Sequence, residues 1–565
     1  MWRRILTVVL ILVQVDCLAQ NADEMEAILR ISGADSPEDM DAYEVERLSD
    51  FLTRPLRVNS ASTTELNASG LMSKYQVASL VDYRTRHSDI MSLMELAAVD
   101  GFDEEFVRRL APFISLVSDA ASSFHGCRSE IAVRGAVRNT VGQTDWNAGL
   151  KYRCQTGRFM LTLAANRAYG ASDFYPSAYS GSFAYYFKRI GGKVLLGDFN
   201  ARFGQGLTLW NGAFITSLNT PEAFMRKPSG LSQSWSYTSS SALTGAAAEV
   251  AVKSFTFTAL FAAPGLKAAT VHPDKVRLMP AVNVTWQGRN GSVGMTHMAE
   301  FLGEPGVRSS LDCAFCIRGV NLYSETAYDW NRRHLNILAG TGFKLGESMR
   351  MALLGRYLSG DLYECAFSGS FGSTARRHVF TFAADAIYYP ESKDESVLHS
   401  VQVKSNADWI YYISPTIQLH LKVSERFRTW GRRFRTDLRG DFTFDNGSFV
   451  STLRMNVLHC KELALLSYIE AGYRKEGFSV YGRCSVFKAD DWEDRIYVYE
   501  RDAPGSFNVP AMYGRGWSAS IVSSYKLNMY LRFYLRASYC GYQFMPQEKR
   551  KPGKAELKFQ LICRF

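Results

Sequence analysis

Residues that could do chemistry are present in this 565-residue sequence, but their spacing supports no active site. The nine histidines include no pair at the interval that places two metal ligands on one face of a helix or strand, and no Gly-x-Ser-x-Gly turn presents a serine nucleophile. Acidic residues gather around Trp492, but a Ca²⁺ loop needs spaced oxygen ligands and a turn glycine, so a solvated loop is favoured. We expect no catalytic residue, metal or cofactor, and the chain is predicted not to be an enzyme.

Two other short motifs have structural interpretations that are simpler than chemical ones. Gly204-x-Gly206 lacks the following helix and Lys-Ser/Thr pair of a phosphate loop, which favours a bulge or tight corner. Cys313 and Cys316 have redox-motif spacing but no βαβ context, which leaves a local disulfide or two unpaired thiols.

From about residue 127 onward, apolar and polar side chains alternate. In one segment Ile417, Leu419, Leu421 and Val423 alternate with Gln418, His420, Lys422 and Ser424. A period of two places each set on its own face of a strand. Because this pattern continues for over 400 residues, in a chain that is 13% aromatic, it predicts a barrel with one face toward lipid and one toward a lumen. We expect roughly 18 to 22 antiparallel strands, and an even number of them.

The predicted lumen face is basic. Its candidate residues are Lys422, Arg426, Arg428, Arg433, Arg435, Arg439, Arg454, Arg483, Arg532 and Arg536. Rings of Arg and Lys favour anions, so one hypothesis is an anion-selective lumen. The alternative is that these groups pair with Asp437, Asp441 and Glu470 across strands and only fill the interior.

The two ends of the sequence indicate export. Residues 1–19 have the charged start, apolar run and small-residue cleavage site of a signal peptide, and Asp16 before Cys17 disfavours a lipoprotein. At the other end Leu557, Phe559, Leu561, Cys563 and Phe565 share one face. A final strand that stops on Phe565 resembles the assembly signal of outer-membrane barrels, which implies outer-membrane lipid and the barrel assembly machinery as partners.

The segment between these parts is acidic and helical. Residues 20–119 hold about 19 acidic and 9 basic groups, whereas the rest of the mature chain is strongly basic. We predict an acidic helical segment over 20–54, a tandem helix-hairpin-helix domain over 55–118 and the barrel over 119–565. Complementary charge predicts that the helical region docks to the barrel mouth or to a partner.

Residues 55–116 repeat one plan, with Gly70 and Lys74 in the first half and Gly101 in the second. They resemble the tandem helix-hairpin-helix domain of the competence DNA-receptor family. That resemblance implies phosphate contacts at Gly70, Lys74 and Gly101. Met72 and Asp103 replace the second glycine of each turn, and Asp103, Glu104 and Glu105 would repel a phosphate, so a structural or protein-docking role is favoured over nucleic-acid binding.

Two further segments, 197–207 and 495–510, together with the helical region resemble an uncharacterised group of exported helix-hairpin-helix proteins with barrel-like carboxyl halves. The predicted fold is therefore mainly β, a large transmembrane barrel preceded by a small all-α domain in the periplasm. The leading functional hypothesis is a channel or transport-associated barrel. The alternatives are a DNA-uptake component and a structural subunit of an envelope assembly machine with a periplasmic partner. The Ser-rich loop 211–241 is long enough to fold into the lumen or to reach outside.

Overall fold

The computed structural model describes residues 24–117, 127–140, 142–187, 191–212, 217–237, 242–268, 276–302, 305–346, 348–373, 377–394, 399–544 and 553–565. The predicted signal peptide and its Cys17 lie outside these residues. No helix within the described residues has the length and apolar character needed to cross a membrane.

Most of the chain forms a closed antiparallel barrel of 24 strands, with β8 as a short extra strand paired to β7. Its first half comprises β3 (Arg128–Thr140), β4 (Gln143–Thr156), β5 (Phe159–Arg167), β6 (Ala178–Tyr186), β7 (Gly191–Arg202), β8 (Gly230–Gln233), β9 (Leu243–Val252), β10 (Phe255–Ala262), β11 (Met279–Gln287), β12 (Gly291–Glu300), β13 (Gly306–Ile317), β14 (Val320–Asp329) and β15 (His334–Leu345). The second half comprises β16 (Met349–Leu358), β17 (Leu362–Ser373), β18 (His378–Tyr389), β19 (Ser400–Ser414), β20 (Ile417–Arg428), β21 (Phe434–Asp445), β22 (Phe449–His459), β23 (Leu463–Lys475), β24 (Phe478–Ala489), β27 (Gly514–Lys526), β28 (Leu531–Phe544) and β29 (Lys554–Arg564).

The last strand closes the barrel against the first. β29 pairs antiparallel with β3, and Ser129 and Phe565 exchange backbone hydrogen bonds of 2.6 and 3.0 Å. The fold class predicted from the alternation of side chains is confirmed. Because the barrel is closed, each of its strands is hydrogen-bonded to a neighbour on both sides, and the described barrel strands leave no open sheet edge.

The two faces of the wall differ as the period of two requires. On β20, Leu421 is 39% and Val423 is 45% exposed on the outside, whereas Lys422 between them is buried inside. On β29, Leu557 and Phe559 lie outside and Gln560 lies inside. An apolar exterior around a polar interior is the arrangement of a transmembrane barrel of the Gram-negative outer-membrane type.

The barrel has more strands than the 18 to 22 expected, although the number is even as predicted. The estimate was low because the connections at one end of the barrel are very short. At that end only two residues separate β4 from β5, β9 from β10, β13 from β14 and β23 from β24. At the opposite end the connections include the long segments 203–242 and 490–513.

The residues before the barrel fold into a separate helical domain. It comprises α2 (Glu24–Ser32), η1 (Pro37–Asp39), α3 (Ala42–Thr53), β1 (Leu56–Arg57), α4 (Thr63–Ser69), α5 (Lys74–His87), α6 (Leu93–Ala97), α7 (Glu104–Leu110), η2 (Ala111–Phe113) and β2 (Ile114–Ser115). Ser62 and Ser73 start α4 and α5 with reciprocal capping boxes. Leu48, Leu66, Leu80, Leu96 and Phe113 form part of its own apolar core.

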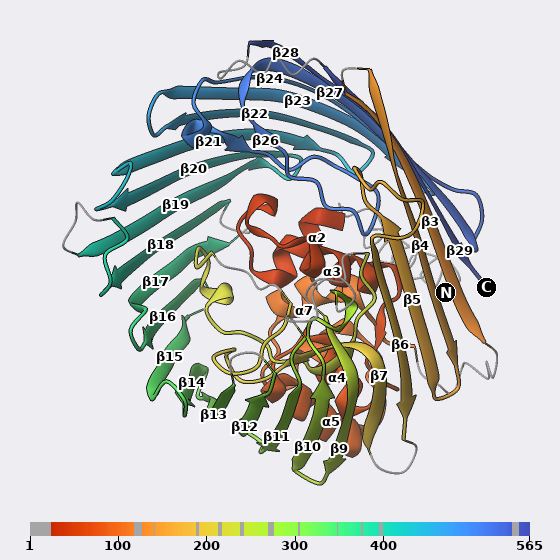
Figure 1. Cartoon of the computed structure of the whole chain (residues 1–565), viewed down its shortest axis with the longest axis vertical. Coiled ribbons are helices and arrows are strands. Elements are labelled where there is room, and N and C mark those ends of the chain that lie inside the picture. The colour runs from red at the N-terminus through yellow and green to blue at the C-terminus, as the bar shows by residue number, and fades with distance from the viewer. Residues whose placement is uncertain are drawn as a thin grey trace, which may run out of the picture.

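The helical domain lies inside the ring of strands (Figure 1). In the same view, α2 and α3 lie near the middle of the ring. Helix α4 contacts β7 and β8, and α5 contacts β11 and β12. The expected docking of an acidic domain to a basic barrel therefore takes the form of insertion into the lumen.

Candidate functional site in the barrel lumen

Helix α3 is held to the wall by its acidic face. Glu46 accepts from the ammonium of Lys151 on β4 in a close contact, and Asp50 forms two hydrogen bonds with the guanidinium of Arg153, at 2.6 and 2.8 Å. Glu44 lies 3.5 Å from Arg202 on β7. Glu46 and Asp50 share one side of α3 because they are four residues apart, and Lys151 and Arg153 share the inner face of β4. Glu44 lies two residues before Glu46 and points to a different side of the helix, toward β7.

Sequence reasoning missed Lys151, Arg153 and Arg202. The signal is present in the sequence, since Leu150, Tyr152 and Cys154 alternate with Lys151 and Arg153 in the same way as the two sets of residues in segment 417–424.

A second group of ion pairs joins the turn before α3 to strands β20 to β22. Lys422 contacts Asp35, and Arg454 and Arg439 lie 2.9 and 3.5 Å from Glu38. The backbone N–H of Tyr499 also donates to Glu38, at 2.9 Å. Burial opposes ionisation of Glu38, but the two guanidinium groups outweigh it and hold the pKa of this carboxyl well below its usual range.

Most of the other predicted lumen residues have partners in the wall, in the inward loops or in the helical domain. Arg483 pairs with Glu470, Arg536 with Glu500 and Glu556, and Arg532 lies 4.0 Å from Glu24. Arg428 donates to Gln402, and Arg435 donates to the carbonyls of Glu493 and Arg495. Arg426 is half-buried on the same inner face of β20 as Lys422. Among these described residues, pairing rather than a free ring of cations is the dominant arrangement.

Arg433 is the exception in that set. It is exposed in the connection between β20 and β21, so it lies at the rim and not on the lumen face. The alternation that placed its neighbours inward does not extend through a turn, where the period of two is lost.

The two helix-hairpin-helix-like turns face the wall. Gly70 ends α4 with a φ of 62°, and Lys74 at the start of α5 donates to Thr285 of β11 at 3.5 Å. Gly101 lies against Tyr75, and Asp103 caps α7 while its carboxylate lies 3.1 Å from Lys344 of β15. Glu105 contacts Arg350 of β16, and Glu104 pairs with Arg108 within α7. The surface that these turns would offer to a phosphate is thus covered by barrel strands.

The long loops at the opposite end also fold inward. In the described part of 211–241, Glu222 accepts from Arg109 and Arg350, and Lys227 donates to the carbonyl of Leu71. In the 490–513 loop, Tyr499 and Phe507 pack on the core of the helical domain. Of the two positions expected for the Ser-rich loop 211–241, its described part takes the one inside the lumen. Residues 213–216 and 238–241 lie outside the described residues.

Gly204 and Gly206 form a tight corner with φ of 59° and 86°. The backbone N–H groups of Gln205 and Leu207 donate to the carboxylate of Glu325 on β14, at 2.6 and 3.1 Å. The corner therefore holds an internal carboxylate.

Cys313 and Cys316 both lie on β13 and are free thiols. Three residues apart on a strand, they point to opposite faces and cannot form the local disulfide considered above.

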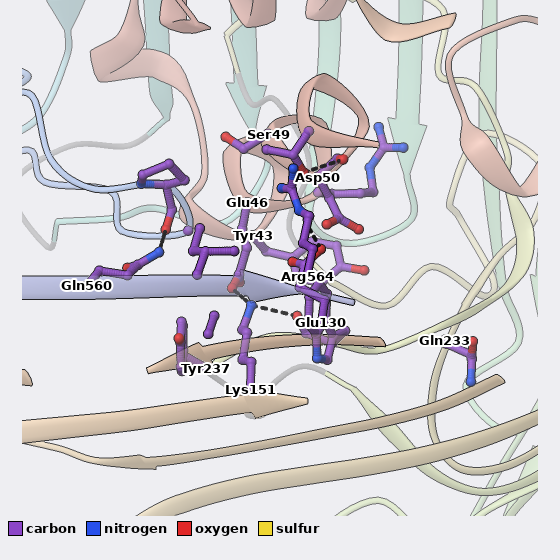
Figure 2. Close-up of a pocket in the computed structure, with 17 residues that line it drawn as sticks. Tyr43, Glu46, Ser49, Asp50, Glu130, Lys151, Gln233, Tyr237, Gln560 and Arg564 are labelled. Carbon is purple, nitrogen blue, oxygen red and sulfur yellow. Dashed lines mark hydrogen bonds and ion pairs between the residues drawn. The ribbon is translucent and has the colours of Figure 1, made fainter. Parts of the chain in front are cut away.

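Small cavities remain between the domain and the wall. One of about 110 Å³ is lined by Tyr43, Glu46 and Asp50 of α3 and by Glu130 and Lys151 of the wall (Figure 2). Another of about 220 Å³ is lined in part by Arg134, Tyr237 and Arg536. Both are below the roughly 300–1,000 Å³ of typical small-molecule sites, so the occupied lumen as a whole is the candidate functional site.

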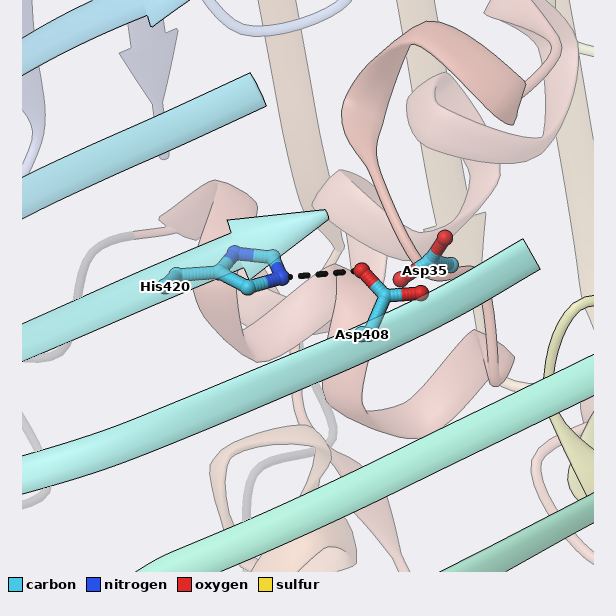
Figure 3. Close-up of side chains that lie close together, drawn as sticks. All are labelled: Asp35, Asp408 and His420. Atoms are coloured by element: carbon cyan, nitrogen blue, oxygen red, sulfur yellow. Dashed lines mark hydrogen bonds and ion pairs between the residues drawn. The ribbon is translucent and has the colours of Figure 1, made fainter. Parts of the chain in front are cut away.

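One cluster of potential metal ligands crosses the boundary between domain and wall. Asp35 of the helical domain lies beside Asp408 of β19 and His420 of β20, and one donor atom from each falls within 4.8 Å of the other two (Figure 3). Sequence reasoning found no ligand spacing because Asp408 and His420 lie on different strands, and Asp35, hundreds of positions before them, meets them only when the domain is inside the barrel.

Comparisons with known proteins identify no family. No protein-family model and no curated protein matches the sequence. Among solved structures, the translocation pore of the P pilus usher PapC aligns over 78% of this chain and 99% of its own, with 7% identity and a TM-score of 0.38. The ferric enterobactin receptor PfeA of Pseudomonas aeruginosa aligns over 78% and 80%, with 8% identity and a TM-score of 0.42. The outer membrane protein opdK of Pseudomonas aeruginosa aligns over 78% and 99%, with 8% identity and a TM-score of 0.29.

Proposed function

We propose that this chain is an outer-membrane transport channel closed by its own helical domain. The observation that carries the proposal is the set of buried ion pairs that hold the acidic helices in the basic lumen, above all Glu38 with Arg454 and Glu46 with Lys151. A barrel of 24 strands is wide enough for a pore, and larger barrels of this kind are closed by an internal domain. A domain held by charge can be displaced without unfolding the wall.

The turn lengths support one orientation in the membrane. Outer-membrane barrels have short periplasmic turns and longer extracellular loops. Lys74 and Asp103 contact β11 and β15 near the short turns that follow these strands. The helix-hairpin-helix-like half of the domain therefore faces the periplasm in this proposal, and the loops 203–242 and 490–513 cover it from outside.

Conductance in planar bilayers tests the proposal with the full mature chain. We expect a low and intermittent current, and more frequent, larger openings in the variant Lys151→Glu, Arg153→Glu, because that variant repels α3 from β4. Lys526→Glu, at the exposed end of β27, is the matched control and should conduct like the parent. A parent chain with a steady, wide current equal to that of the double variant would show that the helical domain does not close the pore.

Nucleic-acid binding is the second function to consider, because residues 55–116 resemble a DNA-receptor domain. In the docked state Lys74 contacts β11 and Asp103 contacts β15, so DNA could reach these turns only after the domain had left the lumen. Salt-sensitive DNA binding by the double variant, and not by the parent, would favour this function.

A role as a subunit of an envelope machine has one supporting observation. Met91 and Met94 of the helical domain are 79% and 72% exposed, and apolar side chains this close together in the sequence can form part of a protein-binding surface. Co-purification of a periplasmic protein that is lost in Met91→Lys would favour this role. In either case the proposal includes no enzymatic activity, and Phe565 on the exposed edge of the seam is proposed to be read by the assembly machinery.

A further inference from the structure

Where the helical domain contacts β19 and β20, there are more carboxylates than basic side chains to neutralise them. Asp35, Asp39 and Asp408 surround the single ammonium of Lys422, which contacts Asp35 and lies 3.8 Å from Asp39. The nearby Glu38 and Asp441 do not share this cation, because Arg439 and Arg454 neutralise them. A further positive charge would be stabilised at this place.

Asp408 provides an independent sign of a missing partner. Its residue is 6% exposed, and its Oδ1 accepts from Nε2 of His420 at 2.9 Å. Its Oδ2 is fully buried and has no hydrogen-bond partner among the described residues. Figure 3 shows the carboxylate of Asp408 between His420 and Asp35, so that this second oxygen is turned toward Asp35. A buried carboxylate oxygen without a partner is costly unless a cation or hydrogen-bond donor satisfies it.

We propose that Asp35, Asp408 and His420 bind a divalent transition-metal ion of the Zn²⁺ class, which joins the helical domain to the barrel wall. The donor set decides the class of ion: an imidazole with two carboxylates suits Zn²⁺ and its first-row neighbours, whereas Ca²⁺ and Mg²⁺ prefer all-oxygen sites. Because metal–ligand bonds of about 2.0–2.2 Å in a tetrahedral site place donors roughly 3.4 Å apart, the side chains would have to move closer together than their 4.8 Å limit.

The surroundings match what a metal-bound histidine needs. Nδ1 of His420 lies 3.9 Å from Asp441, on the side away from Asp408. A histidine that binds a metal through one ring nitrogen commonly directs the other to a carboxylate, which fixes its tautomer. Binding of the ion at Nε2 of His420 would replace its hydrogen bond to Asp408, and the ring would keep a single proton, on Nδ1, on the side of Asp441. Asp35 has two carboxylate oxygens, so it can accept from Lys422 with one and bind the ion with the other.

The register of the wall provides the two strand ligands without a loop. In the ladder of β19 and β20, Asp408 is opposite Lys422 and Ile410 is opposite His420, which makes Asp408 and His420 diagonal neighbours on the inner face. Asp35 is the only one of the three ligands that belongs to the helical domain. The ion would thus act as a clamp between two parts of the molecule, and this inference holds whether or not the channel proposal is correct.

Titration of the metal-free full chain in detergent with Zn²⁺ tests the site. We expect one ion per chain, with affinity reduced at least about tenfold in His420→Gln and in Asp35→Asn. The matched control is His297→Gln, which removes an exposed histidine from β12 and should bind like the parent. No Zn²⁺ binding by the parent, or equal binding by His420→Gln and His297→Gln, would overturn the proposal.

Cobalt separates this site from the cysteines of the chain. Co²⁺ bound by nitrogen and oxygen should give only weak visible absorption, and intense near-ultraviolet charge-transfer bands would assign the ion to thiolates and reject the site. If His420→Gln does not form a heat-modifiable barrel, Asp35→Asn decides the question, because Asp35 is not part of the wall. Loss of binding in Asp35→Asn supports the clamp, and unchanged binding contradicts it.

Discussion

At the scale of single residues, burial decides which ion pairs position the helical domain. The side chains of Glu38 and Arg454 are only 13% and 10% exposed, whereas those of Glu105 and Arg350 are 50% and 20% exposed. Breaking a buried pair costs about 3–5 kcal/mol because an uncompensated charge remains, and an exposed pair contributes about 0–1 kcal/mol. The buried pairs deep in the lumen therefore contribute most of the free energy that attaches the helical domain, and the exposed pairs near the short turns contribute little.

Glu38→Gln should weaken attachment of the helical domain by about 3 kcal/mol, because Arg454 and Arg439 lose their shared carboxylate. Hydrogen exchange of the α3 amides measures this as faster opening. The control Glu105→Gln should change the opening free energy by less than about 1 kcal/mol. Equal effects of the two substitutions would show that burial does not set the strength of these contacts.

Acid should release the domain only at low pH. Burial raises the pKa of Glu44, but Arg47 and Arg202 outweigh this and lower the pKa from 4.5 to about 2. A lowered pKa means that the stabilisation is fully present above pH 4.5 and is lost as the pH falls through about 2. Proteolysis of the helical domain should therefore stay slow from neutral pH to about pH 4.5 and accelerate below it. Release between pH 7 and 5 would contradict this assignment.

At the scale of elements, the sequence predicted the strands and the charge-driven docking of the helical region, but not which residues of the two parts would meet. The alternation around Lys422 predicted an inward cation on a strand, and Gly70 lies where α4 ends, in the turn before α5. Neither pattern predicts that Asp35 lies close to His420, because this contact forms only when the whole helical domain is inside the lumen. The strand number was underestimated for a related reason: two-residue turns leave almost no signal between neighbouring strands.

Ser73→Ala tests the junction between the helices. Ser73 accepts from the N–H of Gln76 at 3.2 Å, and Gln76 returns a bond to the N–H of Ser73 at 2.9 Å. Removing this cap should destabilise α5 by about 1 kcal/mol, measured as faster amide exchange in its first turn. Ser60→Ala is the control, because Ser60 caps none of the described helices, and a loss of similar size there would argue against the capping explanation.

At the scale of the whole molecule, the outer face of the barrel contacts lipid and its inner face contacts the helical domain. A polar substitution has opposite consequences on the two faces, because a charge that pairs with an acidic helix inside has no partner in hydrocarbon outside. The exposed apolar residues of β20 and β29 are thus as much a part of the fold as the buried core of the helical domain.

Val423→Arg should destabilise the barrel by about 2–4 kcal/mol, since Val423 is 45% exposed in the middle of β20 and would meet the bilayer interior. Folding into vesicles at increasing urea, followed by heat modifiability, measures the loss. Leu527→Arg, at the turn after β27, is the depth control and should cost about 0–1 kcal/mol. If both variants folded equally well, the outer face of β20 would not be in contact with lipid.

The pairing of Phe565 with Ser129 has a consequence for the order of assembly. The strand that seals the cylinder is synthesised last, whereas the helices it encloses are synthesised first. The helical domain can therefore fold before the barrel closes. The barrel then closes around a folded domain, which does not have to enter through either end.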